Sequence, residues 1–264
     1  MTGATRPRVL LFDVGGVCVV SPFQAILDYE IANGIPPGWI NFSISRSSPN
    51  GSWHQLERGE ISLDADFFKG FNRDLQQPAL WKEFNHRLRT QKGNSSNVLE
   101  SLPPPPKIDA EYLFWEMMRV SRNPDPFMFP ALRRLKASGQ YLMGALSNTV
   151  IFPAGHPFRE DTIGLREQFD FFISSAHTGL RKPDPKIYAF ALEKANELLA
   201  GREDVRLNAS DVIFLDDIGE NLKAAKKAGF GTIKVVLGRT QDAVKELENI
   251  TGLQLLEDAD RPKL

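Results

Sequence analysis

The sequence has little of several features that would define a protein class at once. It has one cysteine, Cys18, and therefore no internal disulfide. The lack of disulfides is typical of proteins from a reducing compartment. The 32 basic and 33 acidic residues give a net charge of −1, which offers no electrostatic basis for binding nucleic acid or an anionic membrane surface. No apolar run approaches the ~20 residues that a membrane-spanning helix needs, and the N-terminal segment lacks the apolar core of a signal peptide. We therefore expect a cytoplasmic protein with no nucleic-acid partner and no membrane partner.

The rest of the composition is that of a globular protein. Hydrophobic residues make up 42% of the 264 residues and charged residues 25%, which is ordinary for folded domains. A chain of this length forms one large domain or two modest ones. Composition leaves the function open, so the pattern along the chain has to indicate it.

The N-terminal stretch VLLFDVGGVCVV, residues 9–20, has the pattern of a strand that ends at a binding site. The apolar run at residues 9–12 predicts a strand buried on both faces of a parallel sheet. Asp13 follows at the carboxyl end, where ligands bind in open α/β sheets, and Gly15 and Gly16 allow a tight turn and a close backbone approach. A strand followed by an Asx-type turn explains the same residues without a ligand.

Strands alternate with helices in the C-terminal half of the chain. Apolar runs predict four further strands, at about residues 141–148, 171–174, 212–215 and 231–237. Apolar residues at helical spacing predict helices over 125–138 and 185–199, and after each of the last two strands. This alternation favours right-handed parallel βαβ units. We therefore predict an α/β fold with a Rossmann-like, doubly wound parallel sheet.

More than a hundred mostly helical residues separate the first two predicted strands. Helical spacing of apolar residues predicts helices that begin after Ser21 and that cover 63–75 and 80–88. This segment is too long for an ordinary crossover connection. We predict an inserted helical cap subdomain at residues 21–125, on a core formed by residues 1–20 and 126–264.

A run of four prolines, Pro103 to Pro106, interrupts the predicted cap. Such a run favours an extended polyproline conformation. We expect an exposed, stiff linker there. Docking of the prolines on an aromatic-lined partner module is the alternative, and the regulatory role of the loop is left open.

Polar residues follow four of the predicted strands. They are Asp13 after the first strand, Ser147 and Asn148 after the second, Lys182 in the loop after the third, and Asp216 and Asp217 after the fourth. Each has an ordinary explanation by itself, as a helix cap or a solvated charge. The carboxyl ends of parallel strands share one edge of the sheet, however, so together they predict a single crevice that holds carboxylates, a hydroxyl and an ammonium group.

These residues resemble the four motifs of the haloacid dehalogenase-like hydrolases. The similarity is densest over HTGLRKPDPKIY, VIFLDDIGENLKAAKKAG and the tail AVKELENITGLQLL, and it extends to ALSNT and FDVGGV. Within that superfamily the chain most resembles the N-terminal phosphatase-like domain of mammalian soluble epoxide hydrolases. The predicted cap is less well matched, and the proline run has no counterpart in the pattern.

The resemblance implies a magnesium site and a covalent mechanism. Asp13, Asp216, Asp217 and the backbone carbonyl of Gly15 would be the Mg²⁺ ligands, with Asp216 acting partly through water. Asp13 would also attack phosphorus and form an aspartyl-phosphate, which water then cleaves.

The resemblance also implies which residues hold the phosphate. Ser147 and Lys182 would be catalytic as well as phosphate-binding: Ser147 would bind phosphate oxygens, and Lys182 would offset the charge of both Asp13 and the phosphoryl group. Gly15, Gly16 and Asn148 complete the predicted phosphate-binding set.

Gly15 departs from the family pattern, which has an aspartate two residues after the nucleophile. That aspartate protonates the leaving oxygen, and general acid catalysis is typically worth ~10²–10⁴-fold. Its loss should affect alkyl phosphates most and esters with good leaving groups least. His54, from the predicted cap, is the nearest candidate for a substitute acid, but an ordinary polar role is favoured for it.

The leading hypothesis is therefore a Mg²⁺-dependent phosphomonoester hydrolase. Its partner would be a small phosphorylated substrate, including lipid-like phosphates, because aromatic residues are frequent in the predicted cap; a homo-oligomer is left open. A catalytically idle domain that binds Mg²⁺ or phosphoryl groups, or that mediates assembly, is the alternative. A dehalogenase, which would use Asp13 without Mg²⁺, is disfavoured by the acidic pair Asp216 and Asp217.

Overall fold

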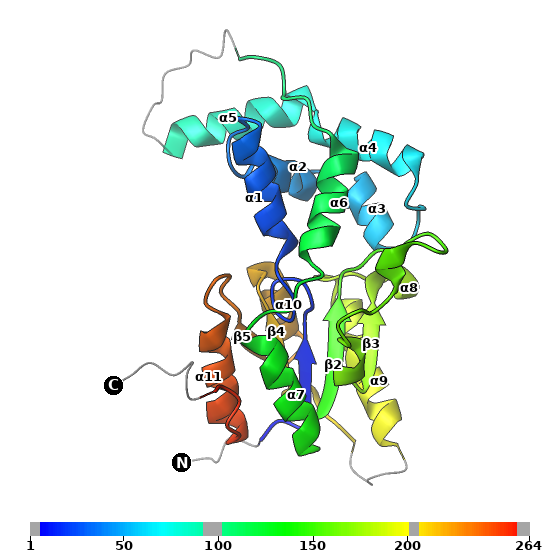
Figure 1. Cartoon of the computed structure of the whole chain (residues 1–264), viewed down its shortest axis with the longest axis vertical. Coiled ribbons are helices and arrows are strands. Elements are labelled where there is room, and N and C mark those ends of the chain that lie inside the picture. The colour runs from blue at the N-terminus through cyan, green and yellow to red at the C-terminus, as the bar shows by residue number, and fades with distance from the viewer. Residues whose placement is uncertain (1–5, 92–101, 201–205, 258–264) are drawn as a thin grey trace.

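The computed structural model describes residues 6–91, 102–200 and 206–257. Its sheet has five strands in the order β3-β2-β1-β4-β5, and all neighbouring pairs are parallel (Figure 1). The strands are β1 Val9–Phe12, β2 Leu142–Ser147, β3 Phe171–Ser174, β4 Val212–Asp216 and β5 Gly231–Lys234. The predicted doubly wound α/β fold is confirmed. The last strand ends three residues earlier than predicted.

The central strand, β1, is buried on both faces. Leu10 and Phe12 belong to one hydrophobic cluster, and Val9 and Leu11 to another, because successive side chains of a strand point to opposite sides. Helices α7 (Met128–Ser138) and α11 (Thr240–Thr251) cover the first face. Helices α9 (Pro185–Leu199) and α10 (Gly219–Lys227) cover the second. A continuous apolar run is therefore required in β1, as the sequence shows.

The pairing register aligns the carboxyl ends of the three inner strands. Phe12, the last residue of β1, lies opposite Ala145 of β2 and Leu215 of β4. The residues just beyond these positions therefore emerge together at one edge of the sheet. This alignment determines which polar side chains can meet.

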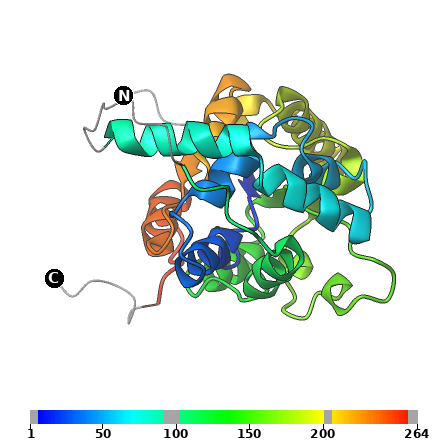
Figure 2. The same ribbon diagram turned by 90° about the horizontal axis from the view of Figure 1, so that it is seen from above.

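Six helices lie above that edge and form a layer of their own, which we call the helical layer (Figure 1). They are α1 Pro22–Ala32, α2 Trp39–Arg46, α3 Ser52–Glu57, α4 Ala65–Leu75, α5 Pro78–Gln91 and α6 Ala110–Val120. Viewed from above, α5 lies across the far side of this layer (Figure 2). None of the helices in the described part of the chain is long and apolar enough to cross a bilayer.

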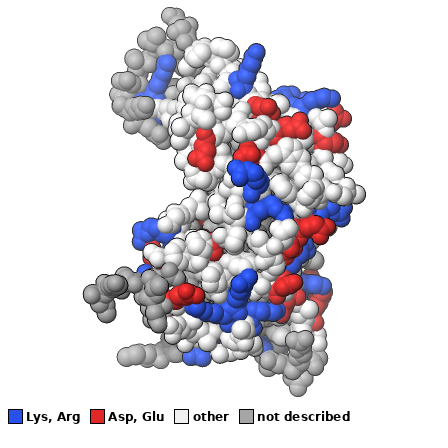
Figure 3. Space-filling view, in the orientation of Figure 1, with Lys and Arg blue, Asp and Glu red and all other residues white. Residues whose placement is uncertain are grey.

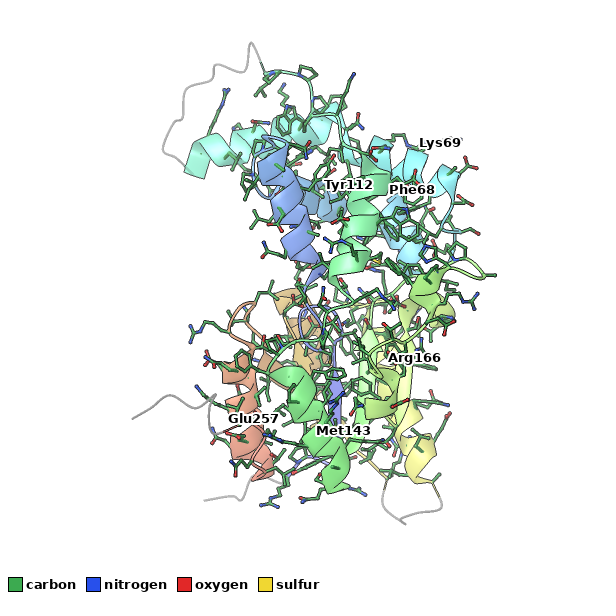
Figure 4. All side chains as sticks on the ribbon, in the orientation of Figure 1. Phe68, Lys69, Tyr112, Met143, Arg166 and Glu257 are labelled. Carbon is green, nitrogen blue, oxygen red and sulfur yellow. The ribbon has the colours of Figure 1, made fainter. Side chains whose placement is uncertain are left out.

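The helical layer has its own hydrophobic cluster, separate from the two that flank the sheet. Aromatic rings make up much of it: Phe67 and Phe68 of α4 both contact Phe114 of α6, with ring centroids 5.5 and 5.7 Å apart. Figure 4 shows Phe68 beside α6. Such pairs add to the stabilisation from burial alone. The proposed division into a cap at 21–125 and a core stays a prediction.

Side-chain caps explain where several helices of this layer begin. The Ser21 hydroxyl accepts from the Phe23 amide, Asp64 accepts from the Asp66 and Phe67 amides, and Asp109 accepts from the Tyr112 amide. The proline run is not helical, and the carbonyl of Pro103 accepts a hydrogen bond from Trp81. The loop is thus attached to the helical layer at its first proline.

One close contact brings α3 onto the short helix α8 (Ser175–Thr178), which follows β3 (Figure 1). Gly59, just after α3, has a φ of +67°, and a Cβ placed there would lie 2.1 Å from the carbonyl oxygen of Ala176. Only glycine allows both that backbone conformation and that distance. The contact therefore positions α3 against the sheet-bearing part of the molecule.

We predict that Gly59→Ala destabilises the protein more than Gly34→Ala. Both glycines have positive φ, so both substitutions cost ~1–2 kcal/mol in backbone strain, but nothing lies within 4 Å of a Cβ at Gly34. The overlap with Ala176 should add about 1–3 kcal/mol to the loss at position 59. Denaturant unfolding measures the loss in the free energy of unfolding for each variant. Equal losses would show that the α3–α8 contact can shift to accept the methyl group without destabilising the protein.

Candidate active site

Three carboxylates meet at the carboxyl edge of the sheet. Asp13 follows β1, Asp216 is the last residue of β4 and Asp217 comes next. One oxygen from each lies within 4.8 Å of the others. The predicted convergence of these three residues is therefore what the structure shows.

Lys182 lies among these carboxylates. Its Nζ is 2.8 Å from Oδ1 of Asp13 and 2.8 Å from Oδ2 of Asp216, and the side chain is only 1% exposed. Burial by itself would lower the pKa of Lys182, but Asp13 and Asp216 outweigh that effect and hold it above its usual value. Lys182 is therefore a charged ammonium group at this edge.

Asp216 is held by a full set of partners. Oδ1 accepts from the amide of Ile218, Asn221 donates to both oxygens, and Lys182 approaches Oδ2. A carboxylate with so many donors has little freedom to turn. Asp216 therefore fits the predicted role of a supporting carboxylate better than that of a mobile one.

Asp217 is different, because its Oδ1 is buried and has no hydrogen-bond partner. Burial, and then the charge of Asp216, raise the pKa of Asp217 to about 7. A buried, unpaired carboxylate oxygen beside two further carboxylates is the donor set that hard divalent cations prefer. The residues present therefore fit Mg²⁺.

One carboxylate oxygen of Asp13, Oδ2, takes no part in the polar contacts of this side chain. Both of its polar contacts, from the Val14 amide at 2.7 Å and from Lys182, are made by Oδ1. Burial raises the pKa of Asp13 well above its ordinary value, and Lys182 opposes that shift. A nearby cation would act in the same direction as Lys182 and favour the ionised, nucleophilic form.

The two glycines of the first loop have separate roles. Gly16 has a φ of +78°, and a Cβ there would lie 2.6 Å from Oδ2 of Asp217. Its amide donates to the carbonyl of Val19 within the loop, so Gly16 contributes space for Asp217 rather than an N–H group for an anion. Gly15 lines the cavity described below.

Ser147 and Asn148 also differ in what they can offer a ligand. The Ser147 hydroxyl lies 3.5 Å from the carbonyl of Asn148, which is a weak contact at best. The side chain of Asn148, by contrast, accepts from the backbone amide of Lys182 at 2.9 Å and donates to its carbonyl at 3.1 Å. Asn148 therefore joins the β2 loop to the loop that carries Lys182.

A cavity of about 410 Å³ lies between this edge and the helical layer. Gly15, Ser147 and Asn148 line it from below, and Trp53, Glu57 and Met118 line it from the helices. Apolar side chains of the segment after β2 add to its wall: Val150, Ile151, Phe152, Phe158 and Ile163. The space-filling view shows a notch at its left, between the upper and lower parts of the molecule (Figure 3).

No pattern in the sequence indicates Glu57, which lines this cavity, or its partner Arg181. Glu57 forms an ion pair with Arg181, with its Oε2 2.9 Å from Nε and 2.6 Å from Nη2. These residues are 124 positions apart, so no local pattern could reveal the pair. Only the direct adjacency of Arg181 to Lys182 was available as a signal.

His54 does not act as the substitute acid considered from the sequence. It is buried and absent from the cavity wall. Burial, and then Arg181 and Arg58, lower its pKa to about 4. A neutral imidazole has no acidic proton to donate at neutral pH, so that interpretation was wrong.

Comparison with known proteins agrees with this geometry. A family model described as haloacid dehalogenase-like hydrolase matches residues 7–229. Bifunctional epoxide hydrolase 2 of Mus musculus is 40% identical over 256 residues, which are 95% of this chain and 40% of that protein. Acyl-CoA dehydrogenase family member 10 of the same organism is 30% identical over 96% of this chain and 20% of its own length. The chain thus spans well under half of these relatives.

A shorter relative and a solved structure match over most of their own length. The sesquiterpene phosphatase astK of Aspergillus oryzae is 24% identical over 85% of this chain and 88% of its own. A crystal structure described as a dehalogenase aligns with a TM-score of 0.53 and 18% identity, over 95% of this chain and 98% of that one. At that identity the structural likeness shows the fold alone.

We predict that Asp217 makes the metal-free protein less stable as the pH rises. Its pKa is about 7 when folded and near 3.8 in its ordinary state, so between these values the folded chain binds the proton that the unfolded chain releases. The free energy of unfolding therefore falls with rising pH, by up to about 4 kcal/mol from this group. Asp217→Asn should remove that fall. Denaturant unfolding in EDTA from pH 4 to 8 tests it, and equal slopes for the two proteins would contradict it.

Proposed function

This chain belongs to the haloacid dehalogenase-like hydrolases, and from that premise we propose that it hydrolyses phosphate monoesters with the aid of Mg²⁺. The observation that carries the proposal is the meeting of Asp13, Lys182 and the pair Asp216 and Asp217 at one sheet edge. Hydrolysis of a phosphate ester requires a nucleophile, fixed positive charge and a means of holding a dianion. This edge offers all three.

In this proposal Asp13, Asp217 and the Gly15 carbonyl hold Mg²⁺, with Asp216 supporting them. The ion supplies positive charge that offsets the charge of the phosphoryl group. Lys182 offsets further charge and keeps Asp13 oriented through its contact with Oδ1. The hydroxyl of Ser147 donates to a phosphate oxygen. Gly16 leaves room for Asp217, and Asn148 keeps the Ser147 and Lys182 loops together.

The reaction proceeds in two steps. An oxygen of Asp13 attacks phosphorus, the bond to the leaving oxygen breaks, and an aspartyl-phosphate forms on Asp13. Water then attacks the same phosphorus, and Asp13 leaves as a carboxylate. Because residue 15 is glycine, it cannot protonate the leaving oxygen, so esters with poor leaving groups should react slowly unless another side chain donates the proton.

The helical layer provides the substrate-selective wall in this proposal. Residues 21–125 act as a cap on a core of residues 1–20 and 126–264, and they close over the substrate and exclude water. The apolar side chains of the cavity favour a phosphate with an apolar tail, such as a lipid-like phosphate. The similarity to a sesquiterpene phosphatase supports this choice.

Two other functions are less well supported. A dehalogenase needs no cation. Without one, the buried and unpaired oxygen of Asp217 beside Asp216 would have no group to compensate its charge. An idle domain that binds Mg²⁺ or phosphoryl groups is favoured only by Gly15. The experiments that follow separate it from an enzyme.

We predict that Asp13→Asn lowers the turnover of p-nitrophenyl phosphate by at least ~10³-fold, since covalent catalysis requires the carboxylate. Mg²⁺-dependent phosphate release measures this, with EDTA removing the activity of the wild type. Asp66→Asn, on the exposed surface of α4, is the control and should retain full turnover. Activity that survives in Asp13→Asn would contradict the covalent mechanism. A wild type inactive on this activated ester would favour the idle domain.

We also predict that Gly15→Asp raises turnover of an alkyl phosphate more than that of p-nitrophenyl phosphate. The nearest atom to a Cβ at Gly15 is Cδ of Pro22 at 3.4 Å, and Gly15 has no positive φ, so a side chain fits. A restored general acid would give up to ~10²-fold on the alkyl ester. Equal gains on both esters would contradict the acid role, and a small selective gain would mean that another side chain already donates this proton.

A further inference from the structure

Gly15, Ser147 and Asn148 line one side of the cavity, so side chains elsewhere on its wall are the candidates to donate a proton to an ester bound there. Three carboxyl groups line that wall, those of Glu57, Glu160 and Asp161, together with the imidazole of His177. They differ in burial and in what already binds them. These differences single out one of the four.

Asp161, Glu160 and His177 are poorly suited to give up a proton to a bound ester. Both oxygens of Asp161 accept backbone hydrogen bonds, from Leu165 at 3.0 Å and Arg166 at 2.7 Å. Glu160 and His177 are exposed, and Nδ1 of His177 is 2.7 Å from the Ser174 hydroxyl.

Glu57 is the buried member of this set. Its side chain is 9% exposed, and it enters the cavity from the end of α3. Both contacts with Arg181 are made by Oε2, so Oε1 takes no part in the ion pair. The α3–α8 contact at Gly59 fixes the turn from which this side chain projects.

The surroundings of Glu57 favour proton exchange. Burial raises the pKa of its carboxyl above the ordinary value, while Arg181, a hydrogen bond with Trp53 and the more distant Lys182 oppose that rise. Arg58 and the neutral His54 are the other titratable groups of this turn. A carboxyl group balanced in this way can serve both as a proton donor and as a proton acceptor.

We propose that Glu57 is the general acid and base of the reaction, acting from the helical layer in place of a carboxylate at position 15. The inference rests on the proposed phosphatase function. When the Asp13 oxygen bonds to phosphorus, the bond to the ester oxygen breaks and that oxygen takes the proton of Glu57, which releases an alcohol. When water attacks the aspartyl-phosphate, its proton passes to the Glu57 carboxylate as the bond between Asp13 and phosphorus breaks. The acid is thereby restored.

The test compares Glu57→Gln with Glu60→Gln, which makes the same change at an exposed glutamate that follows the same helix and is absent from the cavity wall. In Glu57→Gln the glutamine keeps an oxygen that can accept from Arg181, and thermal unfolding checks that the variant is folded. We expect Glu57→Gln to lower kcat/KM for an alkyl phosphate by ~10²-fold or more and for p-nitrophenyl phosphate by less than ~10-fold. Glu60→Gln should change neither.

The double variant Gly15→Asp/Glu57→Gln separates a chemical role from a structural one. A carboxylate at position 15 should restore most of the lost alkyl phosphate turnover, although it cannot restore the ion pair with Arg181. In the wild type the ratio of alkyl to aryl turnover should also fall as the pH rises and Glu57 loses its proton, and this dependence should vanish in Glu57→Gln.

Equal losses on both esters, or no recovery in the double variant, would overturn the assignment and leave Glu57 as a structural partner of Arg181. Those outcomes leave the phosphatase function intact, because it depends on turnover of p-nitrophenyl phosphate by the wild type. A wild type that fails on that ester overturns the proposed function and the role of Glu57 together.

Discussion

The buried ammonium group of Lys182 is the interaction on which the site depends. It lies 2.8 Å from each of two carboxylates in a region almost closed to water. Taking one partner away from a buried ion pair typically costs 3–5 kcal/mol, because the remaining charge has no compensation. Three carboxyl groups within 4.8 Å can all stay ionised at one edge only while cations balance their charge. Lys182 supplies one of these positive charges, and a divalent cation fits the requirement for the others.

The sheet and its edge could be predicted because their signals are local. A strand buried on both faces requires an uninterrupted apolar run, and the polar residue that ends each run marks the sheet edge. Asp13, Ser147, Asp216 and Asp217 were located in this way, and the parallel order then required them to converge. Their geometry agrees with the prediction, whereas their chemical roles are proposals.

Other features could not be predicted because they depend on distant contacts. Helices α2 and α3 begin after Gly38 and Gly51, without a side-chain cap, and are only eight and six residues long, so their sequences lack a clear start signal. The side-chain amide of Asn148 is hydrogen-bonded to the backbone of Lys182, and these residues are 34 positions apart. The pair between Glu57 and Arg181 joins positions 124 residues apart, so it appears only after folding and Glu57 was not a candidate from the sequence.

The attachment of Asn148 to the backbone of Lys182 has a consequence for selectivity. The Asn148 and Lys182 loops are joined at both a donor and an acceptor, so they move as one rigid unit. The conformational entropy of ordering an anion pocket from them is therefore lost during folding rather than on binding. In the phosphatase that we propose, such a pocket would recognise a phosphoryl group whatever is attached to it. Free phosphate, the product, would then compete with every ester for the same place. Discrimination among esters would fall to the helical layer, and release of product would depend on how readily that layer opens.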